Sequence, residues 1–351
     1  NEALDLIKGG NWPNAANISP AAFVDALFQT TVWDGSGSAR SLTNDINLSG
    51  KGGLVWVKKR SGSAQHTLQD TVRGATKHIR SSGDSSEATE AQTITAFNSD
   101  GFSLGTDDLV NASSSDYVGW TFRKQPKFFD IQTWTGDGNT RAISHNLGSV
   151  PGMVLYKNLS SGFNWQVFHR GAGNDRRLEL NGTDSDSSAS GYWDTTTPVT
   201  STVLNVTGDD HINKSGDSHI AYIFAHNDDD GGFGEPGDQD IIKCGSYTGN
   251  NSTTGPVIDL GFEPQWLLIR HTDANGNSWH IFDSMRGVVT GGADAFLAPN
   301  SAGDEQTAAD KVEFNASGFQ LKRANDDVNG SSNNYIYVAI RRGGMQTPTA
   351  A

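Results

Sequence analysis

The sequence predicts an all-β protein built from three tandem, degenerate β-sandwich modules of a jelly-roll-like kind, with a short N-terminal arm that contains one helix. Two observations support this prediction. Five short landmarks recur three times in the same order along the 351 residues, and Asn-Gly or Asp-Gly pairs separate short runs of aromatic and β-branched residues. The repeat period of roughly 100–115 residues suits a sandwich domain and is too long for a solenoid repeat.

The N-terminal arm, residues 1–27, contains the one segment with helical character. Ser19 can cap its first turn, and Pro20 can occupy that turn. Phe23 and Leu27 are four residues apart and would share one helical face. We expect this arm to dock on the first module or on a neighbouring subunit.

Each module opens with an aromatic strand that ends in a Gly turn. The aromatic residue of this strand is Trp33, Trp134 or Tyr247. Positions that recur in an internal repeat usually fill a core, so we interpret these three residues as framework. A buried apolar strand follows each opening, at residues 53–57, 152–156 and 265–269.

The third landmark is a strand that closes on Arg-Gly. Its arginine is Arg73, Arg170 or Arg286, and we place the three at the same point of the repeat. Asp70 and Asp283 precede the first and third by three positions. An internal ion pair is therefore the favoured interpretation, with a ligand carboxylate or sulfate as the alternative. The second copy lacks this Asp, which leaves Arg170 freer to bind a ligand.

Two further strands complete each module. A Gly-Phe-x-Leu strand occurs in the first and third copies and is degenerate in the second, at residues 101–104, 318–321 and 203–206. An apolar strand closes each copy, at residues 117–122, 219–224 and 335–340. The predicted organisation is the arm, modules at 28–124, 129–226 and 241–343, an acidic Gly-rich linker at 227–240 and a loose tail at 344–351. The modules could stack along the chain or close into a compact trefoil-like unit.

The composition agrees with thin β-sheet cores and disfavours several partners. Hydrophobic residues make up 35% of the chain and 41 residues are Gly, so we expect short strands and many turns. The net charge of −14 repels phosphate backbones and anionic lipids, which predicts no nucleic-acid and no membrane partner. Cys244 is the single cysteine, so no disulfide can form within the chain.

The acidic linker is the best candidate metal site. Asp228, Asp230 and Glu235 supply alternating oxygen ligands beside glycines, a pattern that could hold calcium. The spacing does not match a helix-loop-helix calcium site. A solvated linker without a cofactor is the favoured interpretation.

The second module carries a segment that the other two lack. It contains Tyr192 and Trp193, whose aromatic faces could stack on sugar rings. We weigh a surface role for Trp193 equally against a place in the core. With Arg170, these residues form the candidate ligand-binding set.

Motifs for catalysis are missing, so we expect a protein that is not an enzyme and assign no catalytic residue. There is no Gly-x-Ser-x-Gly, no His-Glu-x-x-His and no phosphate-binding Gly loop. His219 occupies the position of Tyr117 and Tyr335 in the closing strands, which favours the edge of the core. A carboxylate pair for sugar hydrolysis stays open, because the sequence does not determine which of the 40 Asp and Glu residues lie close together.

Four segments carry a resemblance to a known family, at residues 70–77, 233–249, 262–269 and 336–342. Over about residues 30–343 the chain resembles uncharacterised structural and tail-fibre-type proteins of marine tailed phages, including cyanophages. Such modules occur beside laminin-G-like or concanavalin-like sandwiches. The resemblance implies a virion component and brings no catalytic residue with it.

The expected function is therefore that of a tail fibre or tail-associated appendage in the virion. Its expected partners are other virion proteins, further copies of the chain (a trimer is favoured) and a host-surface glycan. A capsid decoration or head-fibre protein is one alternative. A glycan-degrading depolymerase is a second, and a secreted bacterial lectin is a third.

Overall fold

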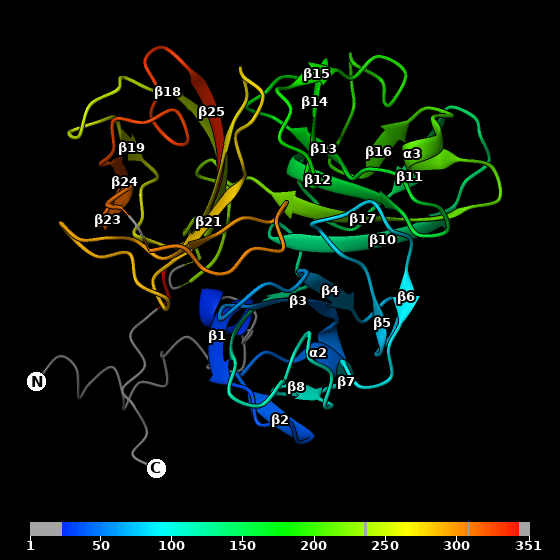
Figure 1. The fold of residues 1–351 in the computed structure, drawn as a ribbon. Coiled ribbons are helices and arrows are strands. Elements are labelled where there is room, and N and C mark those ends of the chain that lie inside the picture. The colour runs from blue at the N-terminus through cyan, green and yellow to red at the C-terminus, as the bar shows by residue number, and fades with distance from the viewer. Residues whose placement is uncertain (1–22, 235–236, 308, 344–351) are drawn as a thin grey trace, which may run out of the picture.

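The structure, a computed structural model, describes residues 23–234, 237–307 and 309–343. Strands dominate these residues, and the two α-helices, Leu48–Lys51 (α2) and Asp210–Asn213 (α3), have four residues each. The predicted all-β sandwich class is confirmed. Figure 1 shows three lobes, blue to cyan, green, and yellow to red, that follow one another along the chain and surround a common centre.

The first module consists of two main antiparallel sheets. One sheet has the order β1 (Phe28–Asp34), β9 (Asp116–Arg123), β3 (Gly53–Lys59) and β4 (Thr67–Asp70). The other has the order β2 (Arg40–Thr43), β8 (Gly101–Leu104) and β7 (Ile94–Phe97). A short ribbon pairs β5 (Lys77–His78) with β6 (Ala88–Thr89). A separate apolar cluster, made only of residues of this module such as Trp33, Val55 and Phe102, fills the space between the two main sheets.

The second module repeats this plan with a longer first sheet and a shorter second one. The first has the order β10 (Phe129–Thr135), β17 (Ser218–Ala225), β12 (Pro151–Asn158), β13 (Gln166–His169), β14 (Arg176–Glu179) and β15 (Ser187–Ser188). The second pairs β11 (Arg141–Ser144) with β16 (Val203–Val206). The degenerate segment at residues 203–206 is therefore a strand, as the repeat predicts.

The third module again has two sheets. One has the order β18 (Ile242–Thr248), β25 (Asn334–Arg341), β20 (Pro264–His271), β21 (His280–Asp283) and β22 (Phe296–Leu297). The other has the order β19 (Val257–Asp259), β24 (Gly318–Leu321) and β23 (Val312–Asn315). The first four strands of the larger sheet follow one another in equivalent order in all three modules.

The opening aromatic residues occupy the same register in every module. Each stacks on the ring opposite it in the closing strand, because directly opposite side chains share one face of a sheet. The centroid distances are 5.6 Å for Trp33 with Tyr117, 5.6 Å for Trp134 with His219, and 4.9 Å for Tyr247 with Tyr335. His219 is thus a buried framework residue, like the tyrosines that it replaces.

The closing strands are buried on both faces, which explains why their sequences are continuously apolar. In β25, Tyr335 and Tyr337 face the interior of the third sandwich, while Ile336 and Val338 face the centre of the molecule. Because successive side chains of a strand point to opposite faces, one closing strand contributes side chains both to the core of its own sandwich and to the central core.

A shared central core joins the three modules. The ring of Phe122 lies 5.5 Å from Phe224 of the second module and 5.8 Å from Trp266 of the third. All three side chains are fully buried. Burial of such a side chain contributes roughly 1.5–3 kcal/mol, so the centre is a major source of stability. The modules close into a compact unit rather than stacking in a row.

The three modules form a closed ring, and equivalent contacts occur at the edge of the core at each of its three junctions. The last residue of each short strand, β4, β13 or β21, contacts the closing strand of the next module. Tyr222 Oη donates to Asp70 Oδ2 at 2.8 Å, and Trp120 Nε1 donates to Asp283 Oδ2 at 2.9 Å. His169 takes the equivalent position in the second module, with its Nε2 3.0 Å from the Tyr337 carbonyl oxygen.

Backbone hydrogen bonds tie the same neighbours together farther out. They run from Glu87 N to Leu159 O, from Asp186 N to Thr272 O and from Glu305 N to Arg60 O, at 2.8–2.9 Å. The three bonds join modules one and two, two and three, and three and one. The ring therefore closes between the first and last modules in the same way as between neighbours in sequence.

The arm differs from the prediction over its described part. Val24–Ala26 (η3) is one turn of 3-10 helix, and β1 begins two residues after it. Leu27 is fully buried in the central core, whereas Phe23 is 41% exposed, so the two side chains do not share a face. A 3-10 turn and the following strand place them differently from an α-helix. Ser19, Pro20 and the rest of residues 1–22 lie outside the described residues, as does the tail at 344–351.

The linker between the second and third modules is held by side-chain caps. Asp240 accepts the backbone N–H groups of Asp229 and Gly231 at 2.9 and 3.1 Å. Asn227 accepts those of Ile241 and Ile242.

Among the described residues no helix is long and apolar enough to cross a membrane.

Candidate functional site

Two of the three predicted arginines are buried structural groups. The side chains of Arg73 and Arg286 are 3% and 0% exposed, and their Nε atoms lie 2.5 and 2.6 Å from Asp70 and Asp283. Each guanidinium also donates to a carbonyl oxygen five residues earlier, in the strand that precedes the turn, at 2.9 Å. Their planar donor groups are thus occupied within the protein, as an internal ion pair requires.

Arg170 does not occupy the same point of the repeat, which corrects the sequence alignment. Its backbone N–H donates to Gly152 O, as Thr71 N donates to Gly53 O and Ser284 N to Gln265 O. Arg170 therefore matches Thr71 in register and comes two positions before the structural arginine. The turn between β13 and β14 has the same length as that between β4 and β5, so Ala172 takes the place of Arg73, and the Arg-Gly pair at Arg170 falls two positions earlier in the structure.

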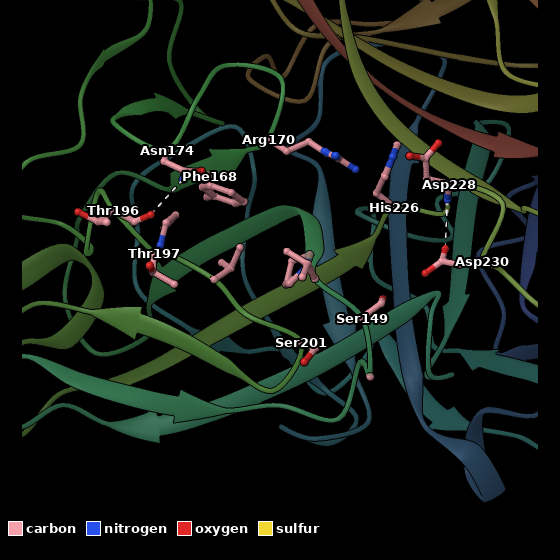
Figure 2. Close-up of a pocket in the computed structure, with 15 residues that line it drawn as sticks. Ser149, Phe168, Arg170, Asn174, Thr196, Thr197, Ser201, His226, Asp228 and Asp230 are labelled. Carbon is pink, nitrogen blue, oxygen red and sulfur yellow. Dashed lines mark hydrogen bonds between the residues drawn. The ribbon is translucent and has the colours of Figure 1, made fainter.

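The side chain of Arg170 faces an open cleft on the outer side of the second module. This arginine is exposed, and within the described residues no hydrogen bond or ion pair holds its guanidinium. The cleft has a volume of about 730 Å³. Figure 2 shows Arg170 reaching from the end of β13 across the cleft toward His226. An uncommitted planar cation at an open site can receive a carboxylate or sulfate.

The walls of the cleft carry both polar and apolar groups, and the polar ones come from several elements. Ser149 lies before β12, Asn174 follows β13, and the hydroxyls of Thr196, Thr197 and Ser201 come from one loop. That loop stands where the other modules have a third strand in the second sheet, at β7 and β23. In the second module isolated bridges from Trp193 and Val199 to β16 replace that strand. The second module is therefore specialised at this cleft.

His226 supplies a second donor at the same end of the cleft. Its Nδ1 accepts the Cys244 N–H at 3.1 Å, so the neutral ring carries its proton on Nε2. The residue is half-buried and lines the cleft. An Nε2–H and a guanidinium can donate together to one anionic oxygen group.

Ser149 adds an uncommitted hydroxyl. The residue is 8% exposed, and its Oγ is buried without a hydrogen-bond partner within the described residues. Unpartnered buried polar atoms also occur at several other described positions, so this hydroxyl does not by itself mark a binding site.

The cleft also has acidic side chains, which lie beside His226 (Figure 2). Asp228 and Asp230 line the cleft, and both are exposed. The Asp228 N–H donates to Asp230 Oδ1 at 3.1 Å, so the two residues form a tight local turn (Figure 2). Carboxylates in such a position accept hydrogen bonds from hydroxyl or amide groups of a ligand.

A family model described as a domain of unknown function (DUF7483) matches residues 25–342. The chain belongs to the DUF7483 family. The match covers all three modules, so the DUF7483 domain is the whole closed ring and not one of its repeats. None of the curated proteins compared with the chain matches it.

The predicted calcium ligands of this DUF7483 chain do not assemble into a metal site that the structure describes. Asp228 and Asp230 are neighbours at the cleft, while Glu235 lies outside the described residues. Within residues 23–234, 237–307 and 309–343 no group of three His, Cys, Asp or Glu side chains is placed to hold a metal ion. Asp240 is committed to capping the linker instead.

Trp193 occupies the core, one of the two places weighed equally for it, so its assignment to the candidate ligand-binding set is corrected. Trp193 is 2% exposed, stacks on Tyr156 at 5.9 Å and donates from Nε1 to Asn174 O at 2.8 Å. It fills the gap that the missing third strand leaves. Tyr192 is half-buried under Arg177, whose guanidinium carbon lies 4.2 Å from the ring centroid. Burial raises the pKa of the Tyr192 hydroxyl, against the opposing charge of Arg177. Neither aromatic residue lines the cleft.

Sequence reasoning missed most of the cleft. Arg170 was found, and Asp228 and Asp230 were assigned to a different role. His226 and Ser149 carry no pattern that separates them from other scattered His and Ser residues. The hydroxyl-rich run at residues 194–201 was a usable signal, because only the second module has it.

Proposed function

We propose that this DUF7483 protein is a non-enzymatic structural component of a bacteriophage particle, a tail fibre or tail-associated appendage that contacts a host-surface glycan. The observation that carries the binding role is the uncommitted Arg170 in an open cleft of about 730 Å³. Protein–glycan contacts favour such open sites, where loops present hydroxyl, amide and charged groups on a rigid scaffold.

The scaffold supports a role in assembly. At the seams, by which we mean the contacts between neighbouring modules, the aspartates of the two Asp–Arg pairs accept hydrogen bonds from the Tyr222 hydroxyl and the Trp120 indole. Groups that are committed in this way hold one rigid unit together and are unavailable for proton transfer. The sequence resemblance to structural proteins of marine tailed phages supplies the link to a virion.

Assembly with other virion proteins, and with further copies of the chain, belongs to the same proposal. A trimer is the favoured assembly. It would bring three clefts to one attachment point, and several weak sites on one particle bind a surface far more tightly than one site does.

Localisation in purified particles tests the proposal. We expect antibodies against the chain to label tails or their appendages in electron micrographs, and peptides of the chain to copurify with particles in a fixed copy number. Labelling of the head surface would favour the capsid decoration alternative. Absence of the chain from purified particles would refute the virion assignment.

Release of reducing ends tests the non-enzymatic part. The purified protein is incubated with host surface polysaccharide, and new reducing ends are measured over time. We expect none above the rate of a heat-denatured control. Steady release would identify a depolymerase.

A further inference from the structure

A second cleft, separate from the one at Arg170, lies in the third module. It has a volume of about 320 Å³ and lies between the turn that precedes β21 and the loop that follows β22. The first module holds this loop in place, because Ala64 N donates to Ala302 O and Glu305 N donates to Arg60 O, both at 2.9 Å. One wall of the cleft therefore depends on closure of the ring. The polar residues that line this third-module cleft are Ser278, His280, Ser301, Asp304, Gln306 and Asp327.

His280 supplies a buried acceptor to the third-module cleft. The residue is 4% exposed, and its Nδ1 lies 3.1 Å from the Ser278 carbonyl oxygen. A carbonyl only accepts, so Nδ1 carries the proton and Nε2 carries a lone pair. Within the described residues Nε2 has no hydrogen-bond partner, and it does not belong to the unpartnered side-chain atoms that the protein encloses completely. Since His280 lines the cleft, this lone pair faces the space of the cleft.

The imidazole of His280 is neutral at physiological pH, so this acceptor persists there. Burial lowers its pKa to about 3, and the nearby ammonium of Lys311 acts in the same direction, against the opposing charge of Asp327. Thr67 and Gln166 occupy the same register in the first and second modules. Of the three modules, only the third places a histidine at this position.

Two carboxylates add acceptors to the cleft, and cations of the chain itself already balance their charge. Asp327 Oδ2 lies 2.8 Å from Lys311 Nζ. Burial lowers the pKa of the Lys58 ammonium to about 8, and Asp304 is the strongest charge that acts against this shift. The lining therefore attracts a further cation only weakly. The second oxygen of each carboxylate has no partner within the described residues and can accept from a neutral hydroxyl.

The same lining offers hydroxyl donors and an aromatic side chain. Ser278 Oγ accepts from Asn300 Nδ2 at 3.2 Å, and Ser301 Oγ accepts from the Gly303 N–H at 3.0 Å, so both hydroxyl protons remain available. The half-buried ring of Phe296 also lines the cleft. A sugar has hydroxyls at its rim and C–H groups on its faces, so it matches a lining of this mixed kind.

We propose that the third-module cleft binds one neutral hexose unit of a glycan. The inference rests on the proposed glycan-binding function and adds a second site to the cleft at Arg170. One sugar hydroxyl donates to His280 Nε2, a second donates to Asp304 or Asp327, and a C–H face of the ring lies against Phe296. The volume of about 320 Å³ is at the lower end of the range for small-molecule sites, roughly 300–1,000 Å³, which suits a single sugar ring.

Saturation-transfer NMR with the full chain tests the proposal. The probes are the methyl glycosides of glucose, galactose, mannose and N-acetylglucosamine, with n-butylamine as a cationic probe. We expect at least one glycoside to bind, with a Kd on the order of 1 mM, and to bind at least about tenfold more tightly than butylamine. Its affinity should be the same at pH 6 and pH 8, because His280 is neutral at both.

Substitutions locate the binding. His280→Leu removes the lone pair and should weaken the bound glycoside by about tenfold or more, because a buried hydrogen bond is lost. Asp304→Asn changes an exposed residue and should weaken it by about three- to tenfold, so it decides the location even where His280→Leu fails to fold. Asp108→Asn is the matched control, since Asp108 is an exposed aspartate of the first module outside both clefts. Its glycoside affinity and the circular dichroism spectra of Asp108→Asn and Asp304→Asn should match those of the parent protein.

Three results would overturn the inference. They are tighter binding of butylamine than of every glycoside, no binding of any glycoside by the folded parent protein, and equal glycoside affinity in the parent protein and Asp304→Asn. Binding of host polysaccharide by the parent protein is measured separately. If the polysaccharide binds while one of these results is found, the proposed glycan-binding function stands and the third-module cleft is excluded. If the polysaccharide does not bind at all, the glycan-binding function itself fails.

Discussion

Tyr222 of the second module donates its hydroxyl proton to Asp70 of the first module, across 152 positions of sequence, at a distance of 2.8 Å. The same carboxylate oxygen lies 2.5 Å from Arg73 Nε. One buried carboxylate thus joins a structural ion pair within its own module to the neighbouring module. Substitutions at these positions distinguish the contribution of contacts between modules to the free energy of unfolding from the contribution of contacts within a module.

Removal of the Tyr222 hydroxyl should weaken the first seam. We expect Tyr222→Phe to lower the free energy of unfolding by about 1–2 kcal/mol, because Asp70 loses a buried hydrogen bond but keeps Arg73. Urea denaturation followed by Trp fluorescence measures this. Tyr337→Phe is the control, since within the described residues no hydrogen bond holds its hydroxyl, and it should cost less than about 0.5 kcal/mol. Equal losses in the two variants would contradict the role assigned to the seam.

Removal of the charge of Asp283 should be far more damaging. In Asp283→Asn, Arg286 is left buried with a weaker partner, so we expect a loss of about 3–5 kcal/mol in the free energy of unfolding. The comparison is Glu263→Gln, which breaks the exposed pair with Arg342 and should cost less than about 1 kcal/mol. Chemical denaturation of both proteins at pH 7 gives the two values, and a small loss in Asp283→Asn would show that Glu305 alone neutralises Arg286.

Acid should destabilise the protein through His169. Burial lowers the pKa of this imidazole to about 4, and the nearby charge of Arg170 acts in the same direction, against the opposing Tyr337 carbonyl. In the unfolded chain the pKa returns to about 6.5, so between these two values the unfolded state binds more protons and stability falls as the pH falls. The contribution of His169 is fully present above about pH 6.5 and declines toward pH 4, by about 2 kcal/mol between pH 7 and pH 5.

A neutral substitution isolates this effect. His169→Gln can still donate to the Tyr337 carbonyl and does not titrate, so its free energy of unfolding should fall less between pH 7 and pH 5 than that of the parent protein. The other buried histidines with a lowered pKa, among them His280 at about 3, remain in both proteins and contribute the residual slope. Parallel pH profiles for the two proteins would exclude His169 as a source of the acid sensitivity.

Gly152 should tolerate no side chain. A Cβ at this position would lie 2.6 Å from Cys244 Sγ and 2.9 Å from His226 Cβ, well inside normal contact. We expect Gly152→Ala to lower the free energy of unfolding by about 1–3 kcal/mol, because the added methyl group has no room beside Cys244 and His226. Gly162→Ala is the control, because the nearest atom to its Cβ would be 3.7 Å away. Urea denaturation of the two variants measures the effect, and equal stability of both would contradict the clash.

The sequence predicts the strands well. It does not predict that the three modules close into a ring rather than stack. Trp33, Trp134 and Tyr247 mark equivalent strands because strand patterning and aromatic packing are local properties that an internal repeat preserves. The contact of Asp70 with Tyr222 depends on how whole modules meet, and no local pattern encodes such a long-range pairing. The sequence left open whether the modules stack or close, and only the packing of Phe122 against Phe224 and Trp266 decides it.

At the cleft, sequence reasoning succeeds for one residue and fails for the rest. Arg170 is singled out because it lacks the Asp that accompanies Arg73, although its Arg-Gly pair stands two positions earlier in the register than that of Arg73. Trp193 was misjudged because a large aromatic residue in a unique segment can fill a gap in the core as easily as cover a surface. His226 lies in the cleft only because the chain bends back there before β18 begins.

The closed ring also constrains how the protein folds during synthesis. Arg60 and Glu305 meet across 245 positions, so the last seam forms only after nearly the whole chain has left the ribosome. Until then the aromatic face around Trp120 and Phe122 has no covering from the third module. Contacts between such distant positions make folding slow and leave apolar surface exposed to aggregation in the meantime. Efficient production in a crowded cell therefore depends on how fast the nascent ring is completed.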